Sequence, residues 1–127
     1  MVIYYLDTSV AVHALLAGPD RDRLNQWIEA NTIVSSRLLR TEMLRFLRRE
    51  SKPLSDANWL LSQVGLIDIT RRVHVLAESI ERHTKTLDAL HLGTALGLEF
   101  EVVIATADRN MRDVAEILTL KVMNPLE

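Results

Sequence analysis

The stretch "EVVIATADRNMRDVAEIL" (residues 101 to 118) decides the fold class. After Glu101 it is a short uncharged run rich in β-branched residues, which is typical of a buried strand. After Asp108 its apolar residues recur at helical spacing, which indicates a short amphipathic helix. A strand that passes through an acidic turn into a helix is a repeating unit of α/β domains.

The same unit recurs along the chain. In "VIYYLDTSVAVHALLAG" (2 to 18) a strand over 2 to 6 leads into a helix that Thr8 or Ser9 would cap and Gly18 would end. Further strands are predicted at 32 to 36, 66 to 69, 101 to 106 and, as an edge strand stopped by Pro125, from 121. The remaining helices are predicted over 20 to 30, 37 to 50, 55 to 64, 71 to 83, 86 to 98 and 108 to 118. This alternation predicts an α/β fold with a central, mostly parallel sheet and helices on both faces.

Composition limits the protein classes further. A chain of 127 residues that is 48% hydrophobic suits one domain, residues 1 to 127, with a sizeable core. The absence of cysteine excludes disulfides, thiolate metal ligands and a cysteine nucleophile. A net charge of -2 gives no global positive field, so any site for a polyanion must be local. No apolar run approaches the ~20 residues of a membrane span, and we expect a soluble, cytoplasmic protein.

Two acids follow predicted strands. Asp7 comes after "VIYYL" and Asp108 comes after "VVIAT", each with hydroxyl side chains nearby. In open parallel sheets the carboxyl ends of the strands border the ligand crevice, so both acids would face one cleft. The alternative is that each is only a helix cap, a role for which Asp at a strand-to-helix turn is favoured.

Two more acids lie on or beside apolar helix faces. Asp88 is the only formal charge in "TLDALHLGTALGL" (86 to 98), and Glu42 lies at the border of the apolar stripe of its helix. Asp88 could instead sit in a first turn because the helix dipole favours an acid there. Glu42 could instead be a solvated residue paired with Arg45 or Arg49. His91 is expected to be packed or hydrogen bonded rather than a ligand.

Taken together, the four acids indicate a cation site. Two carboxylates at ~4 Å repel by about 4 kcal/mol if the effective dielectric constant is about 20. A hard divalent cation with oxygen ligands would relieve this repulsion, and Mg²⁺ or Mn²⁺ fits best because the four histidines form no HxxxH or HExxH pair.

The chain resembles the PIN-domain nucleases, most closely the VapC-type toxins of bacterial and archaeal toxin-antitoxin pairs. The resemblance rests on four ordered motifs: "YLDTSV", "SSRLLRTEMLRFLRR", "TLDALHLGTAL" and "IATADRNM". It implies a PIN-like three-layer sandwich and a metal-binding catalytic quartet of Asp7, Glu42, Asp88 and Asp108. It also implies that the hydroxyls of Ser9 and Thr106 help to hold the site. Asp113 is either a further, looser acid or the partner of Arg109 in a surface pair.

The resemblance further implies an endoribonuclease that uses one or two Mg²⁺ or Mn²⁺ ions, a VapB-type antitoxin as partner and a homodimer. Six basic residues lie between 37 and 52, and among them Arg45 and Arg49 flank Glu42 on the helical wheel, where they could contact RNA phosphates. They could equally form a solvated face. Two alternative functions remain at this stage: a catalytically silent module of the same fold, and a haloacid-dehalogenase-type phosphotransferase using Asp7. Ser9 stands where that second chemistry requires an acid.

Overall fold

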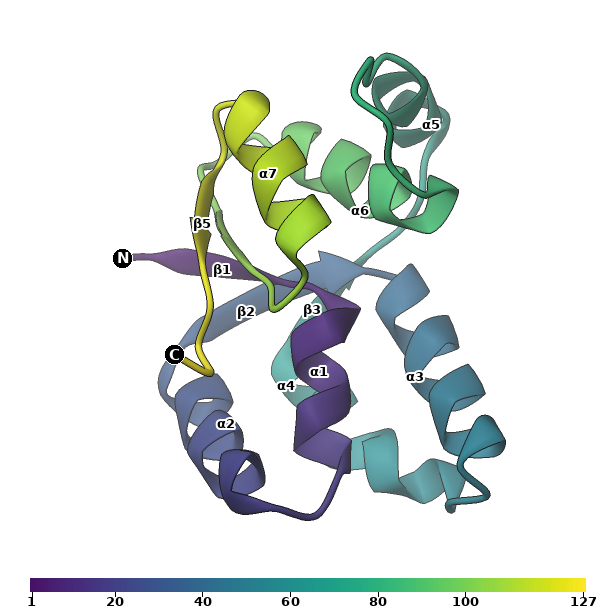
Figure 1. The fold of residues 1–127 in the computed structure, drawn as a ribbon, viewed down its shortest axis with the longest axis vertical. Coiled ribbons are helices and arrows are strands. Elements are labelled where there is room, and N and C mark those ends of the chain that lie inside the picture. The colour runs from purple at the N-terminus through teal and green to yellow at the C-terminus, as the bar shows by residue number, and fades with distance from the viewer.

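Five parallel strands form one sheet at the centre of the molecule (Figure 1). The computed structural model describes all 127 residues. The strands are β1 (Ile3–Leu6), β2 (Thr32–Ser36), β3 (Val64–Ile67), β4 (Val103–Ala105) and β5 (Lys121–Met123). The helices are α1 (Thr8–Leu15), α2 (Pro19–Ala30), α3 (Leu38–Arg49), α4 (Asn58–Gln63), α5 (Arg71–Glu78), α6 (Thr86–Leu96) and α7 (Arg109–Ile117), with a 3₁₀ turn η1 (Leu54–Ala57) before α4.

The strand order β3-β2-β1-β4-β5 reverses direction at the centre of the sheet. From β1 the chain moves to β2 and β3 on one side, and it then returns to place β4 and β5 on the other side. In open α/β sheets, ligands bind outside the carboxyl ends of the two strands that flank such a reversal. Here these strands are β1 and β4, which pair in parallel with Leu6 opposite Ala105.

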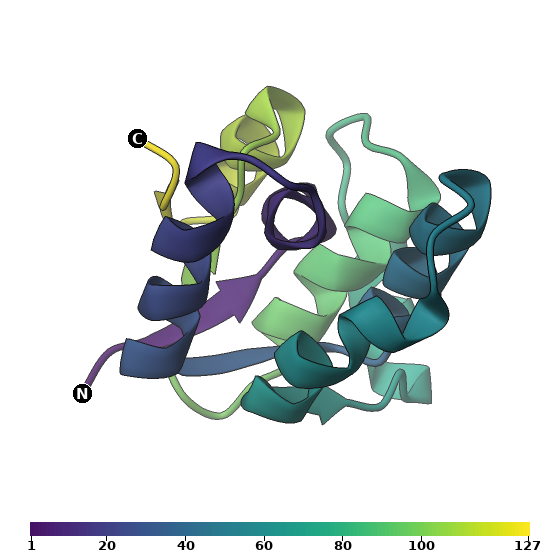
Figure 2. The ribbon, with the colours of Figure 1, turned by 90° about the horizontal axis from the view of Figure 1, so that it is seen from below.

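Helices cover both faces of the sheet, so the predicted three-layer α/β fold is confirmed. Successive residues of β1 point to opposite faces. Leu6 packs with α1, α2, α3 and α4, whereas Tyr5 packs with α6 and α7. Figure 1 shows these two groups of helices on either side of the sheet, and Figure 2 shows α1 end-on. The longest helices have 12 residues, and none is suited to crossing a bilayer.

Several predicted boundaries were wrong. Strand β3 begins at Val64 instead of residue 66 because pairing with β2, from Ile33 opposite Val64 onward, sets its register. Gly65 interrupts the apolar run and hides that start from a sequence pattern. The helix predicted over 55 to 64 is divided between η1 and α4, the helix predicted over 71 to 83 ends at Glu78, and the strand predicted over 101 to 106 is paired only over β4.

The predicted ends of the first helix also need correction. Neither Thr8 nor Ser9 caps α1, because its N-cap position is Asp7. The helix ends at Leu15, and Gly18, with φ at 154°, is instead the residue before Pro19 at the start of α2.

The helices α5 and α6 pack backbone to backbone at Gly93. A Cβ atom added to Gly93 would lie 2.7 Å from the carbonyl oxygen of Val73 and 3.0 Å from the nitrogen of Ala77. Only glycine permits this approach. The contact fixes α6, and therefore Asp88 and His91, relative to α5.

Candidate active site

Asp7 lies at the carboxyl end of β1 and is buried, with 4% of its surface exposed. Its Oδ2 accepts hydrogen bonds from the hydroxyls of Ser9 at 2.7 Å and Thr106 at 2.8 Å. Although Asp7 occupies the N-cap position of α1, its side chain accepts no capping bond. The capping alternative is therefore wrong for Asp7, whose carboxylate is held instead by the hydroxyls of Ser9 in α1 and of Thr106 just after β4.

Asp108 lies at the carboxyl end of β4 and does cap a helix. Its Oδ1 accepts from the backbone nitrogen of Met111 at 2.8 Å, which confirms the capping alternative for this residue. The side chain is exposed, and its Oδ2 has no protein partner. The backbone nitrogen of Asp108 donates to the Thr106 hydroxyl at 3.0 Å. Because Thr106 also donates to Asp7, one threonine joins both strand-end acids.

Asp88 lies in the first turn of α6, as its alternative interpretation held. The helix dipole does not dominate there, because the pKa of its carboxyl is raised from 3.8 to about 6. Partial burial is the largest cause, followed by the negative charges of Asp7 and Asp108. Glu42 raises the pKa further and His91 opposes the shift. The carboxylates of Asp7, Asp108 and Glu42, from three other parts of the chain, thus disfavour the charged form of Asp88.

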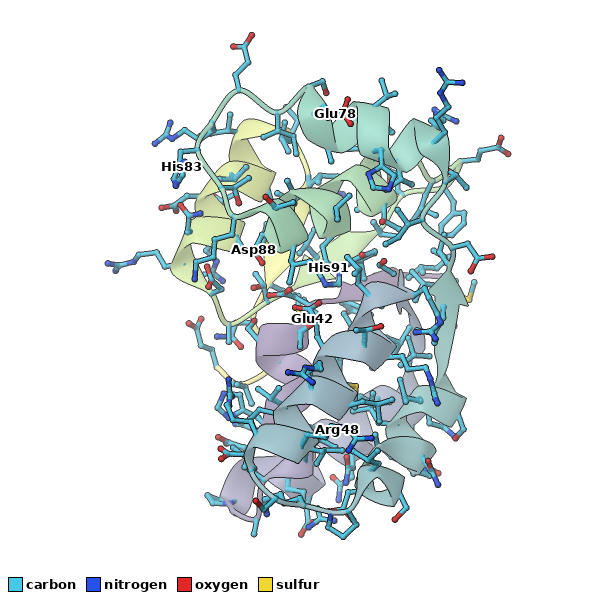
Figure 3. The ribbon with its side chains drawn as sticks, turned by 90° about the vertical axis from the view of Figure 1, so that its right-hand side faces the viewer. Glu42, Arg48, Glu78, His83, Asp88 and His91 are labelled. Atoms are coloured by element: carbon cyan, nitrogen blue, oxygen red, sulfur yellow. The ribbon has the colours of Figure 1, made fainter.

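Glu42 projects from α3 toward α6 and is held by two donors. Its Oε1 accepts from the Thr8 hydroxyl at 2.9 Å and lies 2.6 Å from Nε2 of His91. It forms no ion pair with Arg45 or Arg49, so that alternative was wrong. In Figure 3 the labelled side chain of His91 lies beside Glu42, and Asp88 is labelled on the same helix, α6, as His91.

Two participants in this network, His91 and Tyr5, were not singled out from the sequence as part of the site. The prediction that His91 is hydrogen bonded is confirmed, but its partners are Tyr5, through Nδ1 at 2.8 Å, and Glu42. Burial raises the pKa of the Tyr5 hydroxyl further above neutrality, which keeps it protonated. One sequence signal was available: His91 follows Asp88 by three positions and therefore shares its helix face.

The donor set fits a hard divalent cation. It consists of carboxylate oxygens and hydroxyls, and the raised pKa of Asp88 indicates negative charge that the protein does not neutralise. As the side chains stand, no three His, Asp or Glu residues lie close enough together to hold one ion. Catalytic contacts are often loose in a ligand-free site and tighten on binding. To hold an ion at this site, the carboxylates would have to turn toward one another.

A groove of about 690 Å³ opens beside Glu42. Its basic residues are Arg45, Arg48 and Arg49 of α3, and none of them forms an ion pair. Arg49 also stacks 5.3 Å from the ring centre of Phe46. The helical wheel of the sequence singled out Arg45 and Arg49 as possible phosphate contacts. It missed Arg48, which lines the same groove.

Asp113 stands apart from the hydrogen-bonded network. It is exposed on α7 and forms no ion pair with Arg109, so the predicted surface pair is not formed.

Comparison with known proteins identifies the class. The PIN domain model matches residues 4 to 117 of the chain. The chain belongs to the PIN-domain family, which confirms the resemblance drawn from its four motifs. It is 31% identical over 106 residues to a protein named Ribonuclease VapC47 from Mycobacterium tuberculosis, covering 77% of this chain and 78% of that protein.

Solved structures share the fold at lower identity. VapBC2 from Rickettsia felis, bound to a DNA fragment from its promoter, matches with a TM-score of 0.76 and 19% identity, covering 97% of this chain and 98% of that one. FitAcB from Neisseria gonorrhoeae matches with a TM-score of 0.73 and 18% identity, covering 98% of each chain.

Proposed function

We propose that this protein is a divalent-metal-dependent endoribonuclease and the toxin of a VapBC-type toxin-antitoxin module. Family membership, together with the likeness to a protein named as a ribonuclease, supports nuclease chemistry. The observation that carries the proposal is the charge environment of Asp88, whose pKa is raised to about 6 by burial and by Asp7, Asp108 and Glu42. Such a concentration of negative charge is costly to folding and is typical of functional sites.

In the proposed site, Asp7, Asp88 and Asp108 are direct ligands of one or two Mg²⁺ or Mn²⁺ ions. When bound, such a cation would lower the pKa of the water that it holds and balance charge that develops on a phosphodiester. Ser9 and Thr106 donate to one oxygen of Asp7, which fixes the carboxylate and leaves its other oxygen without a hydroxyl partner. Asp108 uses one oxygen to cap α7 and keeps the other available. Glu42 takes part through water or orients the nucleophile.

The substrate is proposed to reach this site along the groove beside Glu42. Arg45 and Arg49 line it, together with Arg48, and their unpaired guanidinium groups suit phosphate oxygens. Few aromatic residues are available for base stacking, since aromatic residues make up 5% of the chain. Contacts to the RNA backbone are therefore expected to contribute more than stacking.

Partners are proposed from the same family relationship. VapBC2 from Rickettsia felis, a toxin-antitoxin complex from Klebsiella pneumoniae and VapBC from Salmonella typhimurium share the fold of this chain. We infer that this chain binds a VapB-type antitoxin, forms a homodimer and acts in the cytoplasm.

The direct test is RNA cleavage by the purified protein. We expect cleavage in Mg²⁺ or Mn²⁺, none after EDTA is added, and none by the Asp88→Asn variant. Mapping new RNA 5′ ends in cells that express wild type or Asp88→Asn would identify the substrate. Cleavage that persists in EDTA, or that is the same for both proteins, would contradict the proposal.

A second candidate is a silent binding module of the same fold. The spacing of the acids favours this silent module, because in their present positions no three of the side chains are close enough together to hold an ion. Titration with Mn²⁺ separates the two candidates: binding below millimolar concentration supports the nuclease, and no binding at millimolar Mn²⁺ supports the silent module. The haloacid-dehalogenase alternative is set aside, because the chain belongs to the PIN-domain family.

A further inference from the structure

We propose that His91 is a positioning residue for Glu42. Anchored by the hydroxyl of Tyr5, it donates to Oε1 of Glu42 and leaves only Oε2 of that carboxylate free for an ion or its water. This inference rests on the proposed nuclease function. It goes beyond the carboxylate quartet because it assigns a role to a buried histidine and a buried tyrosine that do not reach the substrate.

The direction of the hydrogen bonds follows from the atoms available. Nε2 of His91 lies 2.6 Å from a carboxylate oxygen, which can only accept, so Nε2 carries the proton. In the tautomer with its proton on Nε2, the ring accepts at Nδ1, which lies 2.8 Å from the Tyr5 hydroxyl. The backbone nitrogen of Ser36 donates to the Tyr5 oxygen at 3.1 Å. In this arrangement the donors run in one direction, from the Ser36 nitrogen through the Tyr5 hydroxyl and the His91 imidazole to Oε1 of Glu42.

The imidazole is fully buried, whereas the glutamate is partly exposed. His91 is 1% exposed, and the Tyr5 ring packs against it edge to face with centroids 5.8 Å apart. Glu42 keeps 22% of its side chain exposed at the end of three rotatable bonds. A buried donor beside a partly exposed acceptor orients the acceptor, as groups behind metal ligands commonly do.

Both donors to Glu42 act on the same oxygen. The Thr8 hydroxyl donates to Oε1 at 2.9 Å and lies 3.5 Å from Nε2 of His91. Oε2 receives no protein hydrogen bond, and no arginine of α3 pairs with the carboxylate. The two donors therefore determine which oxygen is left available. A histidine with only a packing role would not require a carboxylate at Nε2.

A double-mutant cycle tests this coupling. The variants are His91→Leu, Glu42→Gln and the two combined, with His91→Gln as the conservative control because its amide can reach as far as Nε2. Calorimetric Mn²⁺ titration without RNA gives the affinity, and steady-state cleavage gives kcat and KM. We expect His91→Leu to lower Mn²⁺ affinity and kcat roughly 10- to 100-fold with little change in KM. His91→Gln should recover most of the loss, and His91→Leu should add nothing in the Glu42→Gln background.

Equal losses from His91→Leu in both backgrounds would overturn the proposal, since the effect would not pass through Glu42. Unchanged Mn²⁺ affinity in a folded His91→Leu protein would overturn it as well. Tyr5→Phe in the same cycle provides a test if His91→Leu does not fold, because it keeps the imidazole and removes the hydroxyl that anchors Nδ1. It also removes the acceptor of the Ser36 nitrogen, an effect that is the same in both backgrounds. A loss confined to the background that contains Glu42 is therefore expected. Wild-type binding and cleavage by Glu42→Gln would remove Glu42 from the proposed site. Loss of the His91 coupling alone would leave that site intact.

Discussion

The hydroxyl of Thr106 donates to Oδ2 of Asp7 at 2.8 Å, across 99 positions of sequence. This bond joins the carboxyl ends of β1 and β4, the two strands on either side of the reversal in strand order. The backbone nitrogen of Asp108 donates to the same hydroxyl. The topology of the sheet therefore brings two acids to one point, and α3 and α6 add Glu42 and Asp88 to their surroundings.

Removing one anionic ligand should abolish cleavage while the fold is retained. We expect Asp7→Asn and Asp88→Asn each to lower the rate of Mn²⁺-dependent RNA cleavage by at least about a hundredfold, since losing a ligand costs more than losing a group behind one. An amide keeps the shape and can accept the hydroxyl bonds of Asp7, so thermal melting should stay cooperative. Asp56→Asn, at an exposed acid in η1, is the matched control. Unchanged cleavage by both site variants would defeat the quartet.

The raised pKa of Asp88 gives a pH dependence of stability. The folded protein holds this proton more tightly than the unfolded chain, so stability is lost as pH rises from about 4 through about 6. In EDTA, Asp88→Asn should therefore melt at a higher temperature than wild type at pH 7.5, and the difference should vanish below pH 4. Mn²⁺ should stabilise wild type but not the variant. If Asp88→Asn melts no higher than wild type at pH 7.5, the charged carboxylate of Asp88 is not destabilised by its surroundings, and the explanation fails.

The Arg45→Ala variant tests whether RNA binds along the groove beside Glu42. We expect Arg45→Ala, combined with Asp88→Asn to prevent cleavage, to weaken RNA binding. The slope of log affinity against log salt should become shallower by about 0.7, the amount for one contact to single-stranded phosphate. Arg40→Ala is the control, because Arg40 is exposed on the same helix and does not line the groove. Equal slopes for the two variants would remove Arg45 from the RNA contacts.

Gly93 tests the packing that supports α6. Alanine in a helix interior usually gains up to about 1 kcal/mol over glycine. Here the added Cβ would lie 2.7 Å from backbone oxygen, and overpacking of this kind costs about 1 to 3 kcal/mol. We expect Gly93→Ala to lower the free energy of unfolding in urea. At Gly65 the nearest atom would be 3.5 Å away, so Gly65→Ala should be tolerated. Stabilisation by Gly93→Ala would contradict the close approach of α5 and α6.

The sequence predicted the fold well where a local pattern carries the information. Alternating apolar strands and amphipathic helices were enough to infer the parallel sheet, and the position of Asp7 and Asp108 after strands was enough to expect them at one edge. The start of β3 was missed because its register depends on pairing with β2, and Gly65 breaks the apolar run.

The site was predicted less completely, since a helical wheel fixes the direction of a side chain but not its neighbour. Glu42 was placed correctly beside the apolar stripe, yet its partner is His91, 49 residues away, and not an arginine of its own helix. The sequence also did not show that the side chain of Asp108 caps a helix whereas that of Asp7 does not. It depends on hydroxyls that reach Asp7 from Ser9 and, across the sheet, from Thr106.

The location of a bound ion tests the central claim most directly. Anomalous scattering from crystals of the wild-type protein grown with Mn²⁺ would show where the ion lies. We expect a peak at coordination distance from carboxylate oxygens of Asp7, Asp88 and Asp108, with Glu42 in direct contact or one water away, and no peak in Asp88→Asn crystals. A peak elsewhere, or a protein saturated with Mn²⁺ in which these carboxylates hold no ion, would contradict the account.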